Sequence, residues 1–367
     1  MAELDQLRTR VRGFLAQEIA TGGFSPHCDP WLIGFDRAFS LRLGAAGLLG
    51  LMLPAHYGGG GGSAADRLVV SEELLAAGAP VTAHWFAERQ FAPSILRHGT
   101  CEQKDEWLPR VIRGEVCISV GLSEPDAGSD LAAVRTKAER ADGGWFISGT
   151  KIWTSGAHLA DAIVVLARTG GQKHEGLSQF IVRLPNNDVS IRGINMISGV
   201  RHFNEVHFES TFVPDADVLG EIGQGWKQAM EELAYERVGP ERYLSTLPLL
   251  QELILGLGKN PESSAALGEV LADIRTFRTI NQRVIEHLDS GNTAAIDIPL
   301  LKTIGTNFEQ STVLTALALA NDPLRTSAIT AKAKELLSEA QYQAPSFTIR
   351  GGTNEVLRGI VSKGLLR

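Results

Sequence analysis

The chain has 367 residues, of which 44% are hydrophobic and 21% charged, and its formal net charge is -7. This composition indicates a globular protein of two or three domains and excludes a disordered one. The acidic balance, with no basic run anywhere, excludes the basic stripe typical of nucleic-acid-binding proteins.

Cysteine spacing and hydropathy indicate the cellular compartment in which the protein is expected. The three cysteines (Cys28, Cys101 and Cys117) form no CxxC pair and no metal spacing, which favours reduced thiols. No eighteen apolar residues run together, so we expect no membrane span, and the first residues are too charged for a signal peptide. We therefore expect a cytoplasmic protein without a bound metal.

The first part of the chain is predicted to be helical. Apolar residues recur at three- and four-residue steps from Leu4 to Ile19, which predicts an amphipathic helix. A second apolar stretch covers 35–53, and further helices are predicted from Asp66 and over 102–113. These segments are assigned to an N-terminal helical domain, residues 1–116.

From Cys117 onward the pattern changes to short β-branched segments. CISVGLS, VRTKAER, GWFISGTKIW, DAIVVLART, SQFIVRLP, VSIRGI and NEVHFESTFV follow one another between glycine-rich turns. Such spacing predicts a β-sandwich or barrel, here residues 117–222. Helical periodicity returns after Gly223 and predicts a helix bundle over 223–367. No GxGxxG follows a strand, which argues against a Rossmann site.

Two stretches of the β region could carry chemistry. GLSEPDAGSD, residues 121–130, places hydroxyls and open backbone where a strand becomes a loop, and such a loop can donate hydrogen bonds to a polar ring or phosphate. SGTKIWTSGAH, residues 148–158, places Trp153 beside Thr154 and Ser155, so that an indole could stack on a planar cofactor next to a hydroxyl. Taken alone, the two stretches are better explained as an ordinary β loop and a core tryptophan.

Together these stretches resemble the acyl-CoA dehydrogenase family of flavoproteins. GTCEQKDEWLPRVIRGE, NEVHFESTFVPDADVLGEIGQGWKQAM and the C-terminal RGGTNEVLRGI are similar to further family segments in the same order. The resemblance implies an α+β fold with an N-terminal helical domain, a central β-barrel and a C-terminal four-helix bundle. It also implies FAD bound at a subunit interface and an acyl-CoA thioester as substrate.

The resemblance also implies roles for individual residues. The indole of Trp153 would stack on the isoalloxazine, and Ser155 would hydrogen-bond near its N5. Ser129 would contact both flavin and substrate. The expected FAD-binding residues are Leu122, Ser123, Gly128, Ser129, Trp153, Thr154, Ser155, Thr353 and Glu355, and the expected substrate-binding residues are Ser129, Arg237, Gly351 and Gly352.

The reaction of the family needs a carboxylate that removes the α-proton while a hydride leaves the β-carbon. In many members this base directly precedes the Gly-Thr of the C-terminal motif, where this chain has Gly351. A second branch carries the glutamate on a bundle helix just before an arginine, which here corresponds to Glu236 and Arg237. On a helix Glu232 shares a face with Glu236, whereas Glu231 and Glu241 point away. We predict Glu236 as the base.

Two other family motifs are missing. Arg-x-x-Phe-Gly and Gln-x-x-Gly-Gly-x-Gly serve FAD at the neighbouring subunit, but this chain has RTFRTINQRV and KAKELLSEAQYQAPSF there. The chain is therefore expected to form either a homo-oligomer or a heterotetramer with a homologous subunit, as in members that act on steroid or other bulky thioesters. Electron-transfer flavoprotein is the expected acceptor. A flavin oxidase or monooxygenase, and a non-catalytic partner subunit, remain alternatives.

Overall fold

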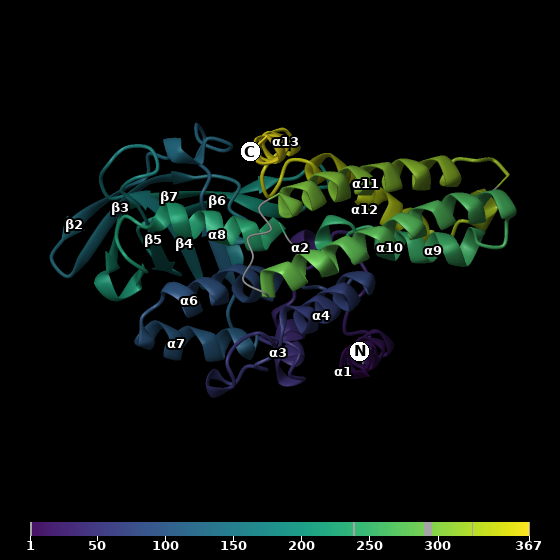
Figure 1. The fold of residues 1–367 in the computed structure, drawn as a ribbon, viewed down its shortest axis with the longest axis horizontal. Coiled ribbons are helices and arrows are strands. Elements are labelled where there is room, and N and C mark those ends of the chain that lie inside the picture. The colour runs from purple at the N-terminus through teal and green to yellow at the C-terminus, as the bar shows by residue number, and fades with distance from the viewer. Residues whose placement is uncertain (1, 238, 290–295, 325, 367) are drawn as a thin grey trace. The chain divides into compact units, whose positions relative to one another are not determined.

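The computed structural model describes residues 2–237, 239–289, 296–324 and 326–366. In these residues helices come first, a run of strands follows, and helices return, which confirms the order expected from the sequence (Figure 1). The chain divides into two compact units. One comprises residues 1–34, 62–80 and 237–367, and the other comprises residues 35–61 and 81–236.

The second unit is built on an eight-stranded sheet of order β6-β7-β3-β2-β4-β5-β8, with β1 added beside β4. The β1–β4 and β2–β4 pairs are parallel and the other pairs are antiparallel. The predicted β segments are thereby confirmed. The strands are β1 (Ile118–Gly121), β2 (Lys137–Ala141), β3 (Gly144–Lys151), β4 (Ala162–Arg168), β5 (Leu177–Arg183), β6 (Val189–Asn195), β7 (Arg201–Pro214) and β8 (Val218–Leu219).

Strand β4 is apolar on both faces because both of its faces are covered. Val164 packs in one cluster with Trp107 of a neighbouring helix, whereas Ile163 and Val165 belong to a cluster on the other face with Phe208. A strand covered on both faces gives a continuous apolar run rather than an alternating one. Each such side chain contributes roughly 1.5–3 kcal/mol through burial.

The helices of this unit flank the sheet (Figure 1). Helix α7 begins with a capping box, in which Thr100 Oγ1 accepts from the Gln103 backbone N–H and the Gln103 side chain accepts in return from Thr100 N–H. Gln103 Nε2 also donates to the carbonyls of Ala216 and Val218 beside β8, at 2.8 Å each. The main helices are α3 (Arg37–Ala45), α5 (Thr82–Phe86), α6 (Ala92–His98), α7 (Cys101–Ile112) and α8 (Gly225–Arg237), and short helical turns occur at η1 (Ala55–Tyr57) and η2 (Ala87–Phe91).

The first unit contains the helix bundle. Helices α9, α10, α11 and α12 lie side by side, and α13 packs on α11 (Figure 1). The Pro240–Arg242 turn, η6, precedes the bundle. The helices of the unit are α1 (Ala2–Ala20), α2 (Pro30–Ile33), α4 (Ala64–Ala76), α9 (Leu247–Leu257), α10 (Pro261–Asp289), α11 (Asp297–Ala320), α12 (Ala331–Phe347) and α13 (Asn354–Leu365).

Ion pairs join α1 and α10 to α4. Glu72 of α4 accepts from Arg8 at 3.0 Å and from Arg278 at 2.8 Å, and Glu73 pairs with Arg12 at 2.7 Å. The two glutamates are buried, whereas the arginines reach solvent, so each buried carboxylate keeps a cationic partner.

The described residues hold neither a candidate membrane span nor a group of metal-ligating side chains. No helix in those parts of the chain has the length and apolarity needed to cross a membrane. No three His, Cys, Asp or Glu side chains among them are grouped as metal ligands. All three cysteines are free thiols.

Candidate functional site

The two motifs of the β region lie side by side. β1 ends at Gly121 and β3 ends at Lys151, and the segments that follow are joined by backbone hydrogen bonding. Ile152 N–H donates to the Ser123 carbonyl at 2.9 Å, and Lys151 Nζ donates to the Leu122 carbonyl at 3.0 Å. The structure thus places Leu122 and Ser123 next to the segment that carries Trp153.

A buried ion pair locks these two segments together. Lys151 is fully buried, and its Nζ lies 2.8 Å from Oε1 of Glu124, which is 8% exposed. The Glu124 carboxylate also accepts the N–H groups of Arg135 at 2.7 Å and Thr136 at 2.8 Å. Burial alone would raise the pKa of Glu124, but the Lys151 ammonium and these hydrogen bonds hold it below its usual value.

Sequence reasoning missed Glu124 and Lys151 as positioning residues. Each stands inside one of the two motifs, Glu124 in GLSEPDAGSD and Lys151 in SGTKIWTSGAH. The sequence offers little signal for them: Lys151 is the only lysine or arginine of the second motif, but Glu124 is one of three acidic residues in the first. Their pairing depends on the contact between the segments that follow β1 and β3, which lie far apart in the sequence and are joined by the hydrogen bond from Ile152 N–H to the Ser123 carbonyl.

Trp153 has the exposure that a stacking residue requires. Its side chain is 56% exposed, its φ is 60°, and its ring makes an edge contact with Phe203 at 5.8 Å between centroids. A positive φ is unfavourable for a bulky residue, and such conformations cluster at ligand sites. The indole is therefore held outward, with one edge supported by Phe203, and is available to a planar ring.

The residues after Trp153 are fixed by the sheet. Thr154 N–H donates to the Asn204 carbonyl, and Asn204 Nδ2 donates back to the Thr154 carbonyl, both at 3.0 Å. The Ser155 carbonyl accepts from Ser119 Oγ at 2.7 Å. Thr154 Oγ1 is buried and has no hydrogen-bond partner among the described residues. An exposed indole beside a hydroxyl without a partner fits a polar aromatic ring system such as a flavin.

Gly128 and Ser129 lie on the exposed side of the first motif. A bridge between Glu124 and Ala127 closes the turn before them, and a Cβ added to Gly128 would meet open space. The buried Ala127 packs with Leu131 and with Ala229 of α8. This packing anchors the loop and leaves the two predicted contact residues accessible to a ligand.

Helix α8 carries the predicted base and two of its competitors. Glu232 is buried, and its carboxylate accepts from Ser94 at 2.9 Å and from Gln179 at 3.1 Å. Glu231 pairs with Arg97 at 3.0 Å and His98 at 2.9 Å. The helix ends at Arg237, so Glu241 lies instead in η6, where it is buried. Glu236 falls on the last turn of α8, and its side chain lies outside the described residues.

The turn that contains the two predicted glycines is held by Arg237. Arg237 Nε donates to the Gly351 carbonyl at 2.9 Å. Gly351 has a φ of 68° and Gly352 a φ of 91°, both in the region that favours glycine. A Cβ on Gly352 would lie 3.1 Å from Arg237 Nη2. The structure therefore brings together three of the predicted substrate-binding residues.

Helix α13 begins directly after this turn. Thr353 is its N-cap, and its Oγ1 accepts from the Val356 N–H at 3.3 Å. Glu355 is exposed in the first turn of the helix, where a carboxylate is favoured by the helix dipole. These observations give both residues a local structural role, and their predicted contacts with FAD stay a prediction.

Lys302 and Arg350 are further anchors of the turn that the sequence did not reveal. Lys302 Nζ donates to the Gly352 carbonyl and to Asn354 Oδ1, both at 2.8 Å. Arg350 makes a two-point pair with the buried Asp29, at 2.6 and 3.0 Å. Nothing in the periodicity of α11 distinguishes Lys302 from a solvated lysine, and Asp29 is more than three hundred positions away from Arg350.

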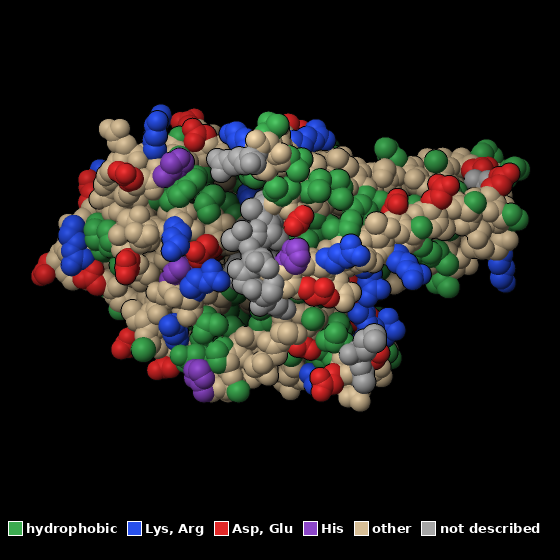
Figure 2. Space-filling model, viewed as in Figure 1, with side chains coloured by type: hydrophobic (Ala, Val, Ile, Leu, Met, Phe, Trp, Pro, Cys, Tyr) green, Lys and Arg blue, Asp and Glu red, His purple; other side chains and the backbone are tan. Residues whose placement is uncertain are grey.

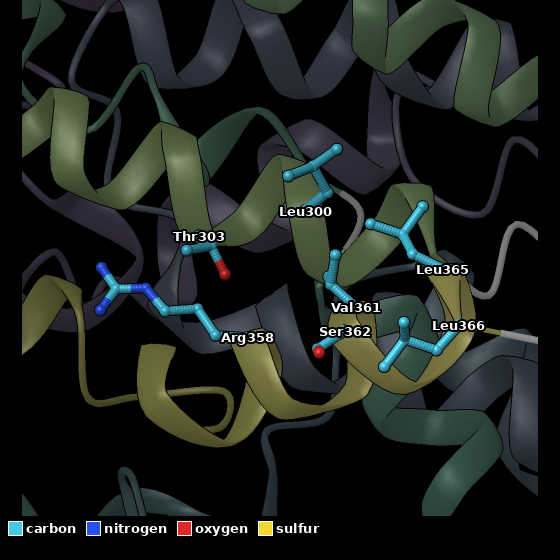
Figure 3. A pocket seen from close by; sticks show the side chains of 7 residues that line it. All are labelled: Leu300, Thr303, Arg358, Val361, Ser362, Leu365 and Leu366. Atoms are coloured by element: carbon cyan, nitrogen blue, oxygen red, sulfur yellow. The ribbon is translucent and has the colours of Figure 1, made fainter.

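A groove of about 350 Å³ runs between α11 and the C-terminal turns of α13 (Figure 3). In Figure 2 hydrophobic side chains gather on the face where these two helices lie. The groove is lined by Leu300, Thr303, Arg358, Val361, Ser362, Leu365 and Leu366. Its lining is mainly aliphatic and contains none of the predicted site residues, so we do not assign the chemistry to it.

The fold agrees with comparisons to known proteins. Three domain families match in order: the acyl-CoA dehydrogenase N-terminal domain over residues 1–115, the middle domain over 119–211 and the C-terminal domain over 256–366. Acyl-CoA dehydrogenase FadE26 of Mycobacterium tuberculosis is 30% identical over 351 residues, covering 89% of this chain and 87% of the relative. The chain belongs to the acyl-CoA dehydrogenase family.

Other relatives are longer than this chain or match less of it. Acyl-CoA dehydrogenase FadE34 of Mycobacterium tuberculosis is 35% identical over 89% of this chain and 45% of the relative. Acyl-CoA dehydrogenase IpdE1 of the same organism is 41% identical over 65% of this chain and 64% of the relative. The chain thus spans less than two thirds of the length of these two relatives.

Two solved structures share the fold over the whole chain. A structure described as the Tcur3481-Tcur3483 steroid ACAD has a TM-score of 0.85 and 26% identity, covering 100% of this chain and 97% of that one. A chain of the ChsE4-ChsE5 complex from Mycobacterium tuberculosis has a TM-score of 0.82 and 28% identity, covering 100% of this chain and 97% of that one.

Proposed function

We propose that this chain binds FAD and dehydrogenates an acyl-CoA thioester to the trans-2-enoyl-CoA. The observation that carries the proposal is the outward Trp153 beside the buried Thr154 hydroxyl that has no partner among the described residues. Family membership supports it, because the family is one of flavoproteins. When bound, FAD accepts the hydride that leaves the β-carbon.

Individual residues of the chain would bind and orient the cofactor. Leu122, Ser123, Gly128, Ser129 and Thr154 would hold the cofactor, Trp153 would stack on its ring, and Ser155 would hydrogen-bond near N5. Thr353 and Glu355 would meet its pyrophosphate or ribityl part. This assignment is supported by the paired loops of the β region and by the position of Thr353 at the start of α13.

We assign proton abstraction to Glu236. An α-proton of a thioester is weakly acidic, so its removal requires a carboxylate and hydrogen bonds that stabilise the developing enolate oxygen. The partners of Glu231 and Glu232 support this choice, because each of these carboxylates is already bound to other side chains. Gly351 occupies the usual place of the base and leaves it open. Arg237, Gly352 and Ser129 complete the predicted substrate contacts.

A heteromeric assembly is the favoured form of the protein. Helix α12 continues to Phe347, and α10 runs through RTFRTINQRV, where the family normally carries its FAD motifs for the neighbouring subunit. These motifs would then come from a homologous partner, as the names of the two solved complexes suggest for those proteins. A homo-oligomer is the alternative. The same proposal includes electron-transfer flavoprotein as the electron acceptor. It also includes a cytoplasmic location, which agrees with the three free thiols.

An anaerobic bleaching screen tests this function. The protein is purified alone and with a co-expressed homologous subunit, and short, long, branched and steroid-side-chain acyl-CoAs are added. We expect flavin absorbance to bleach with at least one acyl-CoA and to recover faster with electron-transfer flavoprotein than with air. Recovery that is faster in air would indicate an oxidase, and absence of bleaching in both preparations would contradict the function.

A further inference from the structure

Lys302 lies near the start of α11 and is fully buried. Its Nζ donates to three oxygens of the segment 348–354: the Gly352 carbonyl at 2.8 Å, Asn354 Oδ1 at 2.8 Å and the Thr348 carbonyl at 3.4 Å. An ammonium group carries three protons, so this one segment supplies an acceptor for each.

Asn354 in turn is held on α11. Its Nδ2 lies 3.2 Å from Thr306 Oγ1 and 3.1 Å from Asn307 Oδ1, and the side chain is buried. Lys302 and Asn354 therefore form one polar network that fixes the first residue of α13 and the carbonyl two residues before it. Burying an ammonium group costs free energy, and a neutral donor could cap a turn at a lower cost.

The network determines where the N–H groups of the turn point. In a planar trans peptide the C=O and the N–H point in opposite directions. Because Arg237 holds the Gly351 carbonyl, the Gly352 N–H points away from Arg237, and because Lys302 holds the Gly352 carbonyl, the Thr353 N–H points away from Lys302. Within the described part of the chain neither N–H has a protein acceptor.

We propose that Lys302 is a positioning residue that orients the Gly351–Thr353 backbone so that its N–H groups can stabilise the developing enolate oxygen of the thioester. The inference rests on the proposed dehydrogenation and adds to it a residue on α11. A cation on the Gly352 carbonyl also polarises the peptide and makes the Thr353 N–H a stronger donor. Lys302 itself does not touch the substrate in this scheme.

The test compares a thioester with a thioether. An S-alkyl-CoA has a CH₂ group in place of the carbonyl, so it keeps the chain and the CoA but offers no oxygen to the turn. With the acyl-CoA that bleaches fastest in the screen, we expect Lys302→Met to lower kcat/KM at least ten-fold, mainly through kcat. The Kd of the matching S-alkyl-CoA, measured by calorimetry, should change less than two-fold.

Glu309→Gln is the matched control, because Glu309 is a fully buried polar residue on the same helix with no hydrogen bond to the turn. This variant should keep kcat/KM. Lys302→Arg keeps a charged donor and should recover part of the activity, and it replaces Lys302→Met in the comparison if that variant does not fold. Equal losses for thioester and thioether, or no loss for either, would overturn the proposal.

A readout without substrate separates this inference from the proposed function. Hydrogen exchange of the peptide covering 348–357 should accelerate at least ten-fold in Lys302→Met and remain unchanged in Glu309→Gln. If no acyl-CoA bleaches the flavin but this exchange accelerates, the proposed dehydrogenation fails while the control of the turn by Lys302 stands. Unchanged exchange would contradict that control even in an active enzyme.

Discussion

Two buried carboxylates, Glu124 and Glu309, stand in opposite electrostatic surroundings. Glu124 accepts from the Lys151 ammonium and two backbone N–H groups and stays ionised. Glu309 accepts from the Ser245 N–H at 2.6 Å, while its Oε2 has no hydrogen-bond partner among the described residues. Burial, followed by the nearby Asp29 carboxylate, raises the pKa of Glu309 to about 8. The first group fixes a loop, and the second is expected to titrate at a higher pH than an ordinary glutamate.

Removing Lys151 should destabilise the β unit. Lys151→Met leaves the Glu124 carboxylate buried without its cation, and breaking a buried pair in this way costs about 3–5 kcal/mol. Urea unfolding would measure the change in the free energy of unfolding. Lys137→Met is the control, because Lys137 and Glu139 form an exposed pair at 2.9 Å, and it should cost no more than about 1 kcal/mol. Similar effects of the two substitutions would contradict the assignment.

Glu309 should make stability depend on pH. Its folded-state pKa lies above its ordinary value of 4.5, so the folded chain binds this proton more tightly than the unfolded chain between about pH 5 and 8. The free energy of unfolding contributed by Glu309 is therefore highest at low pH and falls by up to about 1.4 kcal/mol per pH unit as pH rises towards 8.

Glu309→Gln removes this titration while keeping the shape of the neutral acid. The variant should gain stability relative to the natural protein as pH rises from 5 to 8, measured by urea unfolding across that range. Asp29, Arg350 and Arg242 face the same site, and they stay unchanged in both proteins, so the difference reports Glu309 alone. Parallel stability curves would exclude the raised pKa.

At the scale of elements, the junction between α12 and α13 depends on two consecutive positive φ angles. Gly352→Ala should destabilise the protein by about 1–2 kcal/mol, because its φ is 91° and the added Cβ would meet Arg237 Nη2 at 3.1 Å. The same substitution should lower kcat in the bleaching assay, since the turn would have to move.

Gly359→Ala is the control on the same helix. Gly359 lies inside α13, and a Cβ there would meet nothing within 4 Å, so alanine should be neutral or stabilising by up to about 1 kcal/mol. Melting temperatures of the two variants provide the comparison. If Gly352→Ala melts no lower than Gly359→Ala, the turn does not need a glycine at that position.

Most elements were predictable from the sequence because their periodicity is set locally. The amphipathic pattern from Leu4 predicts α1, and the alternation in NEVHFESTFV predicts β7, as the structure confirms. The pairings that shape the site were not predictable. The pairing of Lys151 with Glu124 depends on how the strands are arranged in the sheet, and the hydrogen bond from Lys302 to Gly352 depends on how α13 packs on α11. Neither contact can be seen in the linear pattern of the sequence. The sequence pattern predicts Glu241 on the same helix as Glu236. The structure corrects this, because α8 ends at Arg237.

At the scale of the whole molecule, the missing FAD motifs determine how the protein should be studied. The domain boundaries at 117 and 223 stay a prediction, and so does the partner subunit. If a homologous subunit completes the FAD site, the chain purified alone should carry little flavin, and co-expression should raise the flavin content. Flavin absorbance per mole of chain and native mass measure both effects together.

The central claim is that proton abstraction has moved from the place of Gly351 to Glu236. Anaerobic mixing of Glu236→Gln with the acyl-CoA that bleaches fastest tests it most directly. We expect flavin to remain bound, the Kd of that acyl-CoA to change by no more than a few-fold, and bleaching to slow at least a thousand-fold. Glu231→Gln, which removes a neighbouring carboxylate paired with Arg97 and His98, should bleach at the natural rate. Rapid bleaching in Glu236→Gln would show that another residue is the base.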